Sequence, residues 1–286
     1  MGIEVLNPAG GGATVVAARA GVCGLAVMAK APRAGMVKTR LSPPLTPAQA
    51  AALNVCFLKD TAESIAAVAA GGVGPGGWRA AGLISYTPVG DEGLFEGLLP
   101  EGFCLVAQRE GDFGQRLLGA AEDILACGFG SVCLIDSDSP TVPRAAYEQA
   151  VLELARPGDR MVLGPTADGG YYLIGMKRAH AAVFERISWS TETVFAETCE
   201  RAREAGIEVV ELPLWYDVDD GATLKILEAE LLAGIAPGFA AEAGYAAENT
   251  RAMLMKTDWA LNAEKRLGLD VGGAADAAVD QQERPG

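Results

Sequence analysis

The chain has 286 residues, half of them apolar, and its 37 acidic and 23 basic residues give a formal net charge of −14. This apolar fraction is enough for a large core and excludes bulk disorder. The negative charge disfavours nucleic acid as a partner, because it repels phosphate backbones. No stretch approaches the roughly 18 consecutive apolar residues of a membrane span, and the start of the chain lacks the pattern of a signal peptide. We therefore expect a cytoplasmic protein that binds neither membranes nor nucleic acid.

Apolar runs and helical patterns alternate along the chain. Residues 1–21, rich in Gly and Ala, are expected to form a flexible leader. Short apolar runs typical of buried strands occupy 22–29, 82–88, 103–107, 131–135, 160–163, 171–176 and 207–212. Helices are expected at 46–70, 114–127, 143–155, 192–205 and 221–232, the first with Thr46 as its N-cap. Residues 236–286 are expected to add a helix at about 246–266 and a tail.

This alternation predicts one α/β domain over 22–235, with a Rossmann-like, mainly parallel sheet and helices on both faces. In such sheets ligands bind beyond the carboxyl ends of the strands. Cysteine and histidine usage narrows the chemistry further. The six cysteines show no CxxC spacing, and His180 is the only histidine. The cysteines therefore give no support for a zinc or redox site. A histidine-based triad or a multi-histidine metal site is excluded, which leaves carboxylates, lysine and metal.

A basic loop follows the first predicted strand. Four basic residues fall within eleven positions of an otherwise acidic chain: Lys30, Arg33, Lys38 and Arg40. Lys38, Thr39 and Arg40 can hold the phosphates of a nucleotide, and Gly35 lets the backbone approach them closely. The spacing is not that of a Walker A loop. The alternative is a solvated basic loop with no ligand.

Aspartates follow two other predicted strands. Asp136 and Asp138 come directly after 131–135, and Asp219 follows 207–212. Carboxylate oxygens are the ligands that Mg²⁺ and Mn²⁺ prefer, usually one or two of them together with substrate phosphates. The alternative for Asp138 and Asp219 is to cap the next helix. Asp220 is the better candidate for the second cap, because it immediately precedes the helix at 221–232.

A third motif lies between strands 160–163 and 171–176. Gly169 and Gly170 can expose backbone N–H groups to a ligand, and Asp168 can orient or deprotonate an acceptor hydroxyl. Asp-Gly is also a strong hairpin-turn signal, so a plain turn is the alternative.

As a set, these motifs resemble the glycosyltransferase-like proteins of DUF2064 type, a family with members associated with arsenosugar biosynthesis. The likeness covers about residues 23–232 and rests on Lys30-Ala31-Pro32, Lys38-Thr39-Arg40-Leu41, Asp138-Ser139-Pro140, Asp168-Gly169-Gly170-Tyr171-Tyr172 and Asp217-Val218-Asp219. It implies a glycosyltransferase-A fold that uses a nucleotide diphosphate donor and a divalent metal. The family usually has a small residue where this chain has Asp136, which makes Asp138 the stronger metal candidate. A more distant likeness to 2-phospholactate guanylyltransferases implies nucleotidyl transfer.

We therefore expect a metal-dependent transferase that moves a glycosyl group from a nucleotide sugar to a small-molecule acceptor. The expected catalytic residues are Lys38 and Asp168, and the expected ligands of Mg²⁺ or Mn²⁺ are Asp136, Asp138 and Asp219. Nucleotide binding is expected from Lys30, Gly35, Lys38, Thr39, Arg40, Gly169 and Gly170. The alternative is a nucleotidyltransferase that joins a nucleoside triphosphate to a phosphorylated small molecule and releases pyrophosphate. A binding module without catalysis is a third reading, and the oligomeric state stays open, with a homodimer as one option.

Overall fold

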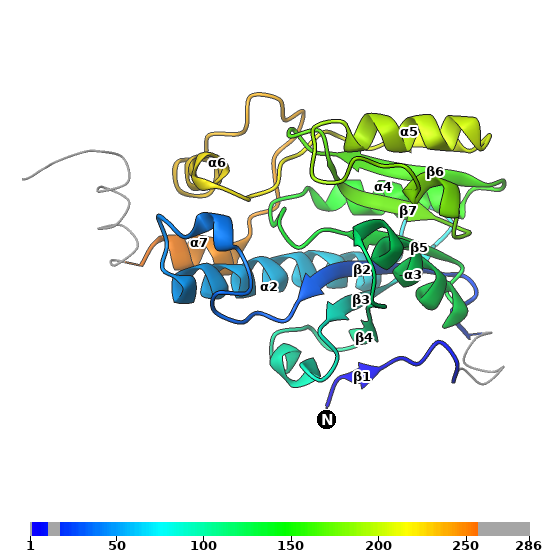
Figure 1. Cartoon of the computed structure of the whole chain (residues 1–286), viewed down its shortest axis with the longest axis horizontal. Helices are drawn as coiled ribbons and strands as arrows, with labels where there is room; N and C mark the ends of the chain where they lie inside the picture. The colour runs from blue at the N-terminus through cyan, green and yellow to red at the C-terminus, as the bar shows by residue number, and fades with distance from the viewer. Residues whose placement is uncertain (1, 11–17, 257–286) are drawn as a thin grey trace, which may run out of the picture.

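One sheet organises the fold in the computed structural model, which describes residues 2–10 and 18–256 (Figure 1). Within these residues the sheet has eight strands in the order β1-β4-β3-β2-β5-β7-β6-β8. Their bounds are Glu4–Val5 (β1), Val22–Lys30 (β2), Arg79–Thr87 (β3), Cys104–Ala107 (β4), Ser131–Ile135 (β5), Arg160–Pro165 (β6), Tyr171–Met176 (β7) and Glu208–Glu211 (β8). Only the pairs of β7 with β5 and β6 are antiparallel. The mainly parallel sheet expected from the sequence is confirmed.

Helices pack on both faces of this sheet. One core layer combines residues of α2 (Pro47–Gly71), α4 (Arg144–Ala155), α6 (Gly221–Ala233) and α7 (Glu248–Leu254). The opposite layer combines residues of α3 (Phe113–Ala126) and α5 (Val194–Glu204). Alternate residues of β2 serve the two layers, because side chains along a strand point to opposite faces: Leu25 packs in the first layer and Ala26 in the second. The expected helices on both faces are confirmed.

The carboxyl ends of four strands lie at one edge of the sheet. β2 and β5 are parallel neighbours. β5 and β6 share a direction, because both are antiparallel to β7, and β8 is parallel to β6. The loops that leave β2, β5, β6 and β8 therefore meet at this edge, and they contain all the motifs singled out in the sequence.

Part of the expected leader belongs to the sheet. β1 pairs with Cys104 and Leu105 of β4, and the backbone N–H of the buried Leu6 donates to the carbonyl of Leu105 at 2.8 Å. The expectation of a flexible leader does not hold for these residues, because a strand of two residues has no period that a sequence pattern could reveal. Residues 11–17 lie outside the described residues. So does 257–266, the second half of the helix expected at about 246–266.

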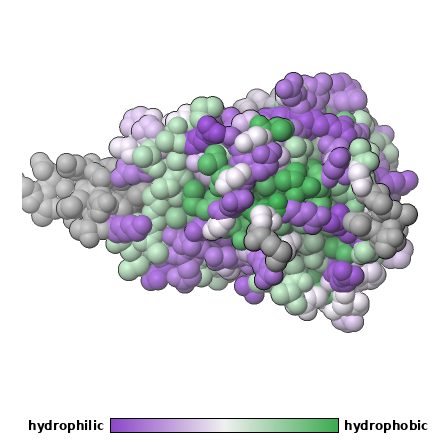
Figure 2. Space-filling view, turned by 90° about the horizontal axis from the view of Figure 1, so that it is seen from below, coloured by the Kyte–Doolittle hydropathy of each residue, from purple (hydrophilic) through white to green (hydrophobic). Residues whose placement is uncertain are grey.

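The face on the β1 side carries apolar surface near its middle, interrupted and surrounded by hydrophilic side chains (Figure 2). Val5 of the edge strand is one of the exposed apolar residues of the molecule. In the part of the chain that the structure describes, none of the helices has the length and apolar character that a membrane span requires.

Helix α7 is fixed on α2 through Asp60. This carboxylate is fully buried and accepts four hydrogen bonds. The backbone N–H groups of Asn249 and Thr250 donate to it at 2.9 and 2.8 Å, and the side chains of the same two residues donate at 2.8 and 2.6 Å. Because the first N–H groups of a helix have no partner within the helix, Asp60 supplies one from a different element.

Candidate active site

The loop after β2 brings Lys38 into the interior. Gly35 has a φ of 76°, which lets the chain turn there. Lys38 itself has a left-handed backbone with a φ of 51°, which is unfavourable for a residue with a side chain and persists only where other contacts hold it. Burial on either side of this backbone holds it in place. Leu41, in the short helical turn after Lys38, is fully buried, and the Lys38 side chain is only 3% exposed.

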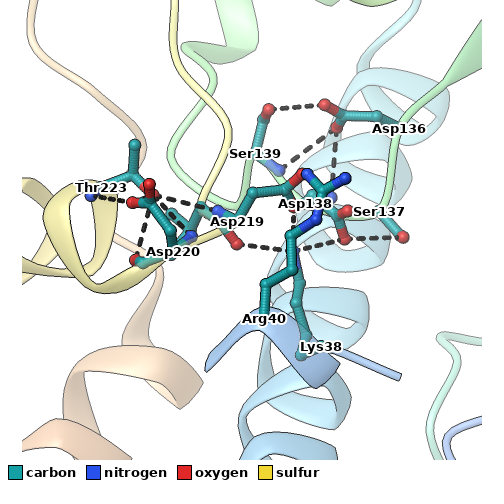
Figure 3. A network of polar contacts seen from close by, with 10 residues as sticks. Lys38, Arg40, Asp136, Ser137, Asp138, Ser139, Asp219, Asp220 and Thr223 are labelled. Carbon is teal, nitrogen blue, oxygen red and sulfur yellow. Dashed lines mark hydrogen bonds and ion pairs between the residues drawn. The ribbon is translucent and has the colours of Figure 1, made fainter. Parts of the chain in front are cut away.

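The ammonium of Lys38 joins three loops (Figure 3). Its Nζ lies 2.8 Å from Oδ1 of Asp138 and 3.2 Å from Oδ1 of Asp219, and it donates to the carbonyl of Val218 at 2.7 Å. Burial, the largest effect, lowers the pKa of Lys38, but Asp138 and Asp219 more than compensate, so the pKa is raised. Lys38 is therefore a fixed positive charge that holds the loops after β2, β5 and β8 together.

Asp136 and Asp138 perform different tasks in the loop after β5. Oδ1 of Asp136 accepts from the backbone N–H groups of Asp138 and Ser139 at 3.3 and 3.2 Å, and Oδ2 accepts from the Ser139 hydroxyl at 2.7 Å. Burial, followed by repulsion from Asp138, raises the pKa of Asp136 well above its usual range. These contacts make Asp136 an organiser of the loop. Asp138, which is 32% exposed and bonded to Lys38, is better placed to meet a ligand.

Asp219 and Asp220, in the segment after β8, have different contacts. Asp220 caps α6, since its Oδ1 accepts from the N–H groups of Ala222 and Thr223, both at 2.9 Å. The predicted cap is confirmed. Asp219 turns instead toward Lys38, and its Oδ2 lies 3.5 Å from the Arg40 guanidinium (Figure 3). The capping of α6 is therefore the task of Asp220, and Asp219 lies beside two basic side chains.

Asp217 is a site residue that the sequence analysis did not select. Burial, followed by the charges of Asp168 and Asp219, raises its pKa to about 7. The signal in the sequence was the alternation Asp217-Val218-Asp219, which places two carboxylates on the same side of an extended segment.

The hairpin loop between β6 and β7 has the contacts of a tight turn, the alternative that the sequence left open. Oδ1 of Asp168 accepts from the Thr166 hydroxyl at 2.6 Å and from the N–H of Gly170 at 3.0 Å, as in a tight turn. Gly169 has a φ of 91°, and a Cβ there would lie 2.1 Å from the carbonyl oxygen of Glu192. This glycine therefore allows the segment around Glu192 to pack against the hairpin, which is a different task from the expected contact with a nucleotide.

Two adjoining clefts open at this edge of the sheet, with volumes of about 310 and 390 Å³. Lys30, Lys38 and Thr39 line the first cleft, together with Asn54 and Arg116, which the sequence analysis did not select. Asp136, Asp168, Gly170 and Asp217 line the second. Four residues line both and mark the junction: Arg40, Phe113, Asp138 and Asp219. Gly35 and Gly169 line neither cleft.

Two polar residues of the first cleft come from helices that carry no motif. Asn54, from α2, is 4% exposed, and its Oδ1 has no hydrogen-bond partner among the described residues. Arg116, from α3, lies over the ring of Phe113 at 5.5 Å. Neither position stands out in the sequence, because each is one polar residue in a helical pattern.

The oxygen atoms at the junction suit a hard divalent cation. Asp138, Asp219 and the carbonyl of Val218 already surround one cation, the ammonium of Lys38. Within residues 2–10 and 18–256, no three acidic, histidine or cysteine side chains are grouped so that they alone could hold a metal. This donor set therefore fits an ion held by one or two carboxylates with substrate phosphates as its other ligands, the usual arrangement for Mg²⁺.

Comparison with known proteins gives a family match over part of the chain and a fold. Residues 76–191 match the family described as "Uncharacterized protein conserved in bacteria (DUF2064)", which confirms the family likeness expected from the sequence. Comparison with curated proteins gives no match. A solved structure from Desulfovibrio desulfuricans G20, provisionally named a nucleotide-diphospho-sugar transferase, is 28% identical with a TM-score of 0.67, over 85% of this chain and 97% of that chain. The expected glycosyltransferase-A fold, which is that of nucleotide-diphospho-sugar transferases, is thereby confirmed.

Two other solved structures are more distant. CMP:2-keto-3-deoxy-manno-octonic acid synthetase in complex with CTP is 13% identical with a TM-score of 0.47, over 74% of this chain and 99% of that chain. Glucosyl-3-phosphoglycerate synthase from Mycobacterium tuberculosis, in complex with Mn²⁺, UDP and phosphoglyceric acid, is 12% identical with a TM-score of 0.43, over 81% of this chain and 84% of that chain.

Proposed function

We propose that this protein is a metal-dependent transferase that moves a glycosyl group from a nucleotide sugar to a small-molecule acceptor. The observation that carries the proposal is the Lys38 ammonium between Asp138 and Asp219, at the junction of a basic and an acidic cleft. The likeness to the provisionally named nucleotide-diphospho-sugar transferase supports the same enzyme class.

The first cleft suits the nucleotide end of the donor. Its basic side chains are Lys30, Lys38, Arg40 and Arg116. Guanidinium groups bind phosphate oxygens through two parallel hydrogen bonds, and a buried ammonium adds a fixed charge. Such preorganised charges stabilise the negative charge that develops on a departing nucleoside diphosphate.

Asp138 and Asp219 are the residues that would hold Mg²⁺ or Mn²⁺ on the diphosphate. When bound, the ion supplies Lewis-acid neutralisation of the leaving group. The task of Lys38 is to keep these two like-charged side chains together, since its Nζ contacts both. Asp136 remains a weaker candidate ligand, because both of its oxygens already accept hydrogen bonds within its own loop.

Asp168 is the proposed base or orienting group for the acceptor hydroxyl. Its Oδ1 is held by Thr166 and Gly170, which fixes the carboxylate at the wall of the second cleft. A general base must lie within hydrogen-bond reach of the proton that it accepts, and a fixed carboxylate facing the acceptor cleft meets that requirement.

Nucleotidyl transfer is the second candidate, and a specific observation favours it. Four basic side chains in the first cleft are enough to bind a triphosphate as well as a diphosphate. The two reactions differ in their leaving group. Glycosyl transfer releases a nucleoside diphosphate, and nucleotidyl transfer releases pyrophosphate.

The experiment uses the full chain with Mn²⁺ or Mg²⁺ and two panels of donors. UDP- and GDP-sugars form one panel, and GTP, CTP and UTP form the other. Thermal shift measures binding, and the released nucleoside diphosphate or pyrophosphate identifies the reaction. Metal-dependent release of nucleoside diphosphate supports the proposal. Release of pyrophosphate supports the alternative, and a protein that no nucleotide stabilises contradicts both.

A further inference from the structure

The two clefts of the site have opposite charge. The second cleft is lined by six carboxyl groups, Asp136, Asp138, Asp168, Glu192, Asp217 and Asp219, and by one cationic side chain, Arg40. Among the described residues, ion pairs to Asp138 and Asp219 neutralise part of this charge. Asp136, Asp168, Asp217 and Glu192 form no ion pair with any lysine, arginine or histidine within residues 2–10 and 18–256. The raised pKa values of Asp136 and Asp217 reduce the charge that these two groups carry, so the negative charge left when the edge next to the first cleft is neutralised comes mainly from Asp168 and Glu192.

The excess charge lies on the part of the second cleft that is away from the proposed metal site. Asp138 and Asp219 stand at the junction, whereas Asp168 and Asp217 line only the second cleft. A cation bound at the junction would offset the junction carboxylates first, because electrostatic attraction falls with distance. The group that enters from the far side of the second cleft consequently meets carboxylates.

One wall of this cleft, which begins at Phe113 of the junction, is aromatic and well anchored. Trp189 packs edge-on against Phe113, with ring centroids 5.0 Å apart and planes at 81°. The first turn of α5, which follows the loop that carries Trp189, is tied to the β6–β7 hairpin, since the N–H of Phe195 donates to the carbonyl of Gly169 at 2.8 Å. Aromatic faces bind apolar C–H surfaces and cations. Carboxylates that accept hydrogen bonds, next to such a wall, suit a ligand rich in hydroxyl or ammonium donors.

From this lining we infer the class of acceptor, an inference that rests on the proposed function. The acceptor is a hydroxyl-bearing molecule without phosphate or carboxylate groups, and an ammonium group on it strengthens binding. Its hydroxyl or ammonium protons are donated to Asp168, Asp217 and Glu192, and the transferred glycosyl group forms its new bond to an acceptor oxygen at the junction of the clefts. The C–O bond to the nucleoside diphosphate breaks, the diphosphate leaves with the bonding electron pair, and Asp168 takes the hydroxyl proton.

The charge of the acceptor distinguishes glycosyl transfer from nucleotidyl transfer. Nucleotidyl transfer to a phosphorylated molecule requires a phosphate dianion to enter the second cleft. Like charges brought together in a partly desolvated cleft are repulsive and oppose binding. A non-anionic acceptor agrees with glycosyl transfer.

The test compares acceptors that share a skeleton and differ in charge. One set is glucose, glucosamine and glucose 6-phosphate, and the other is glycerol, 2-amino-1,3-propanediol and glycerol 3-phosphate. Each is added to the full chain with Mn²⁺ and a donor that it hydrolyses, and the increase in nucleoside diphosphate release gives kcat/KM. A set without turnover is compared by calorimetric Kd on the enzyme saturated with Mn²⁺ and nucleoside diphosphate. We expect the amino member of each set to have a higher kcat/KM, or a tighter Kd, than the neutral member. The phosphorylated member should have a kcat/KM or an affinity at least about tenfold below that of the neutral member.

Charge-removing variants test whether the lining causes this preference. Glu192→Gln combined with Asp217→Asn should reduce the preference for the neutral over the phosphorylated member by about tenfold. Glu200→Gln is the matched control, because Glu200 is exposed on α5 and pairs with Arg203 away from the cleft. It should leave the preference unchanged. A preference that the double variant does not alter overturns the inference.

Failure of the inference and failure of the proposed function give different results. The acceptor class is rejected if the phosphorylated member has the highest kcat/KM or the tightest Kd, or if none of the six compounds gives a response. Donor hydrolysis would still support the proposed function in either case. No binding and no hydrolysis of any nucleotide sugar rejects the proposed function itself.

Discussion

The Nζ of Lys38 lies 2.8 Å from Oδ1 of Asp138, although the two residues belong to loops after different strands. The same ammonium lies 3.2 Å from Asp219, 181 positions further along the chain. One cation therefore fixes the relative position of two carboxylates that would otherwise repel each other. The predictions below begin with this contact.

Lys38→Met should lower kcat/KM for nucleotide-sugar turnover by roughly 100-fold or more, the size of effect typical of losing one preorganised charge at a leaving group. Methionine keeps the length of the side chain but leaves Asp138 and Asp219 without their shared partner. Steady-state release of nucleoside diphosphate is the measurement. Lys30→Met is the control, because the exposed Lys30 lines the same cleft without contacting either carboxylate, and a loss below about tenfold is expected there. Equal effects of both variants would contradict a special role for Lys38.

Asp138→Asn and Asp136→Asn should separate the proposed metal ligand from its neighbour. Asp138→Asn should abolish the response of activity to Mn²⁺, because a neutral amide is a weaker ligand for a hard cation. Asp136→Asn should keep that response. Its amide oxygen can still accept from the N–H groups of Asp138 and Ser139, and its amide nitrogen can donate to the Ser139 hydroxyl.

The measurement is a Mn²⁺ titration of activity, accompanied by calorimetry of Mn²⁺ with nucleoside diphosphate present. Wild-type Mn²⁺ affinity in Asp138→Asn would remove this residue from the metal site. Loss of the Mn²⁺ response in Asp136→Asn, in a variant that is still folded, would restore Asp136 as a ligand.

Asp60→Asn should destabilise the fold by about 2 kcal/mol, because the amide nitrogen would face the donors of either Asn249 or Thr250 and leave a backbone N–H of α7 without an acceptor. For a domain of this size this corresponds to a decrease of roughly 5 °C in Tm. The matched control is Glu63→Gln. Glu63 also contacts the Asn249 side chain, but in an exposed position, so its variant should stay within about 0.5 kcal/mol of the wild type. Indistinguishable denaturation curves for the two variants would contradict the role of Asp60 in fixing α7 on α2.

Glu230 should make stability depend on pH. Burial, the largest effect, raises the pKa of this carboxyl, although hydrogen bonds from Tyr216 and Thr141 lower it in part. The folded state therefore binds the proton more tightly than the unfolded state. The stabilisation from this preference is fully present below the usual glutamate pKa of about 4.3 and is lost as pH rises through the higher folded value.

Glu230→Gln should consequently raise Tm relative to the wild type at pH 7 to 8, and the difference should shrink toward pH 4. Glutamine can still accept a hydrogen bond from the Tyr216 hydroxyl, so packing is kept. Thermal unfolding across this pH range is the measurement. A variant that is less stable than the wild type by the same amount at every pH would show that the hydrogen bond, and not the burial of charge, dominates at this position.

Local features of this protein could be predicted from its sequence. The strands β5 and β7 have the bounds that their apolar runs indicate. Thr46 caps α2 and Asp220 caps α6, and each uses a partner three positions along the chain. The positions of Lys38, Asp138 and Asp168 on loops that leave strands followed from the same pattern. These features depend on backbone preference and on contacts between neighbours in sequence, which a short window of residues contains.

Only the tertiary structure decided how the motifs combine. The antiparallel direction of β7, the pairing of β1 with β4 and the meeting of Asp217 with Asp168 depend on contacts between distant segments. The same holds for Asn54 and Arg116, which helices α2 and α3 bring to the first cleft. In the local pattern Asp136 and Asp138 are alike, and only the family resemblance ranked Asp138 first. In the folded chain Asp136 bonds within its own loop, whereas Asp138 contacts Lys38. Burial and charge partners determine the chemistry of a side chain, and both are set by packing at long range.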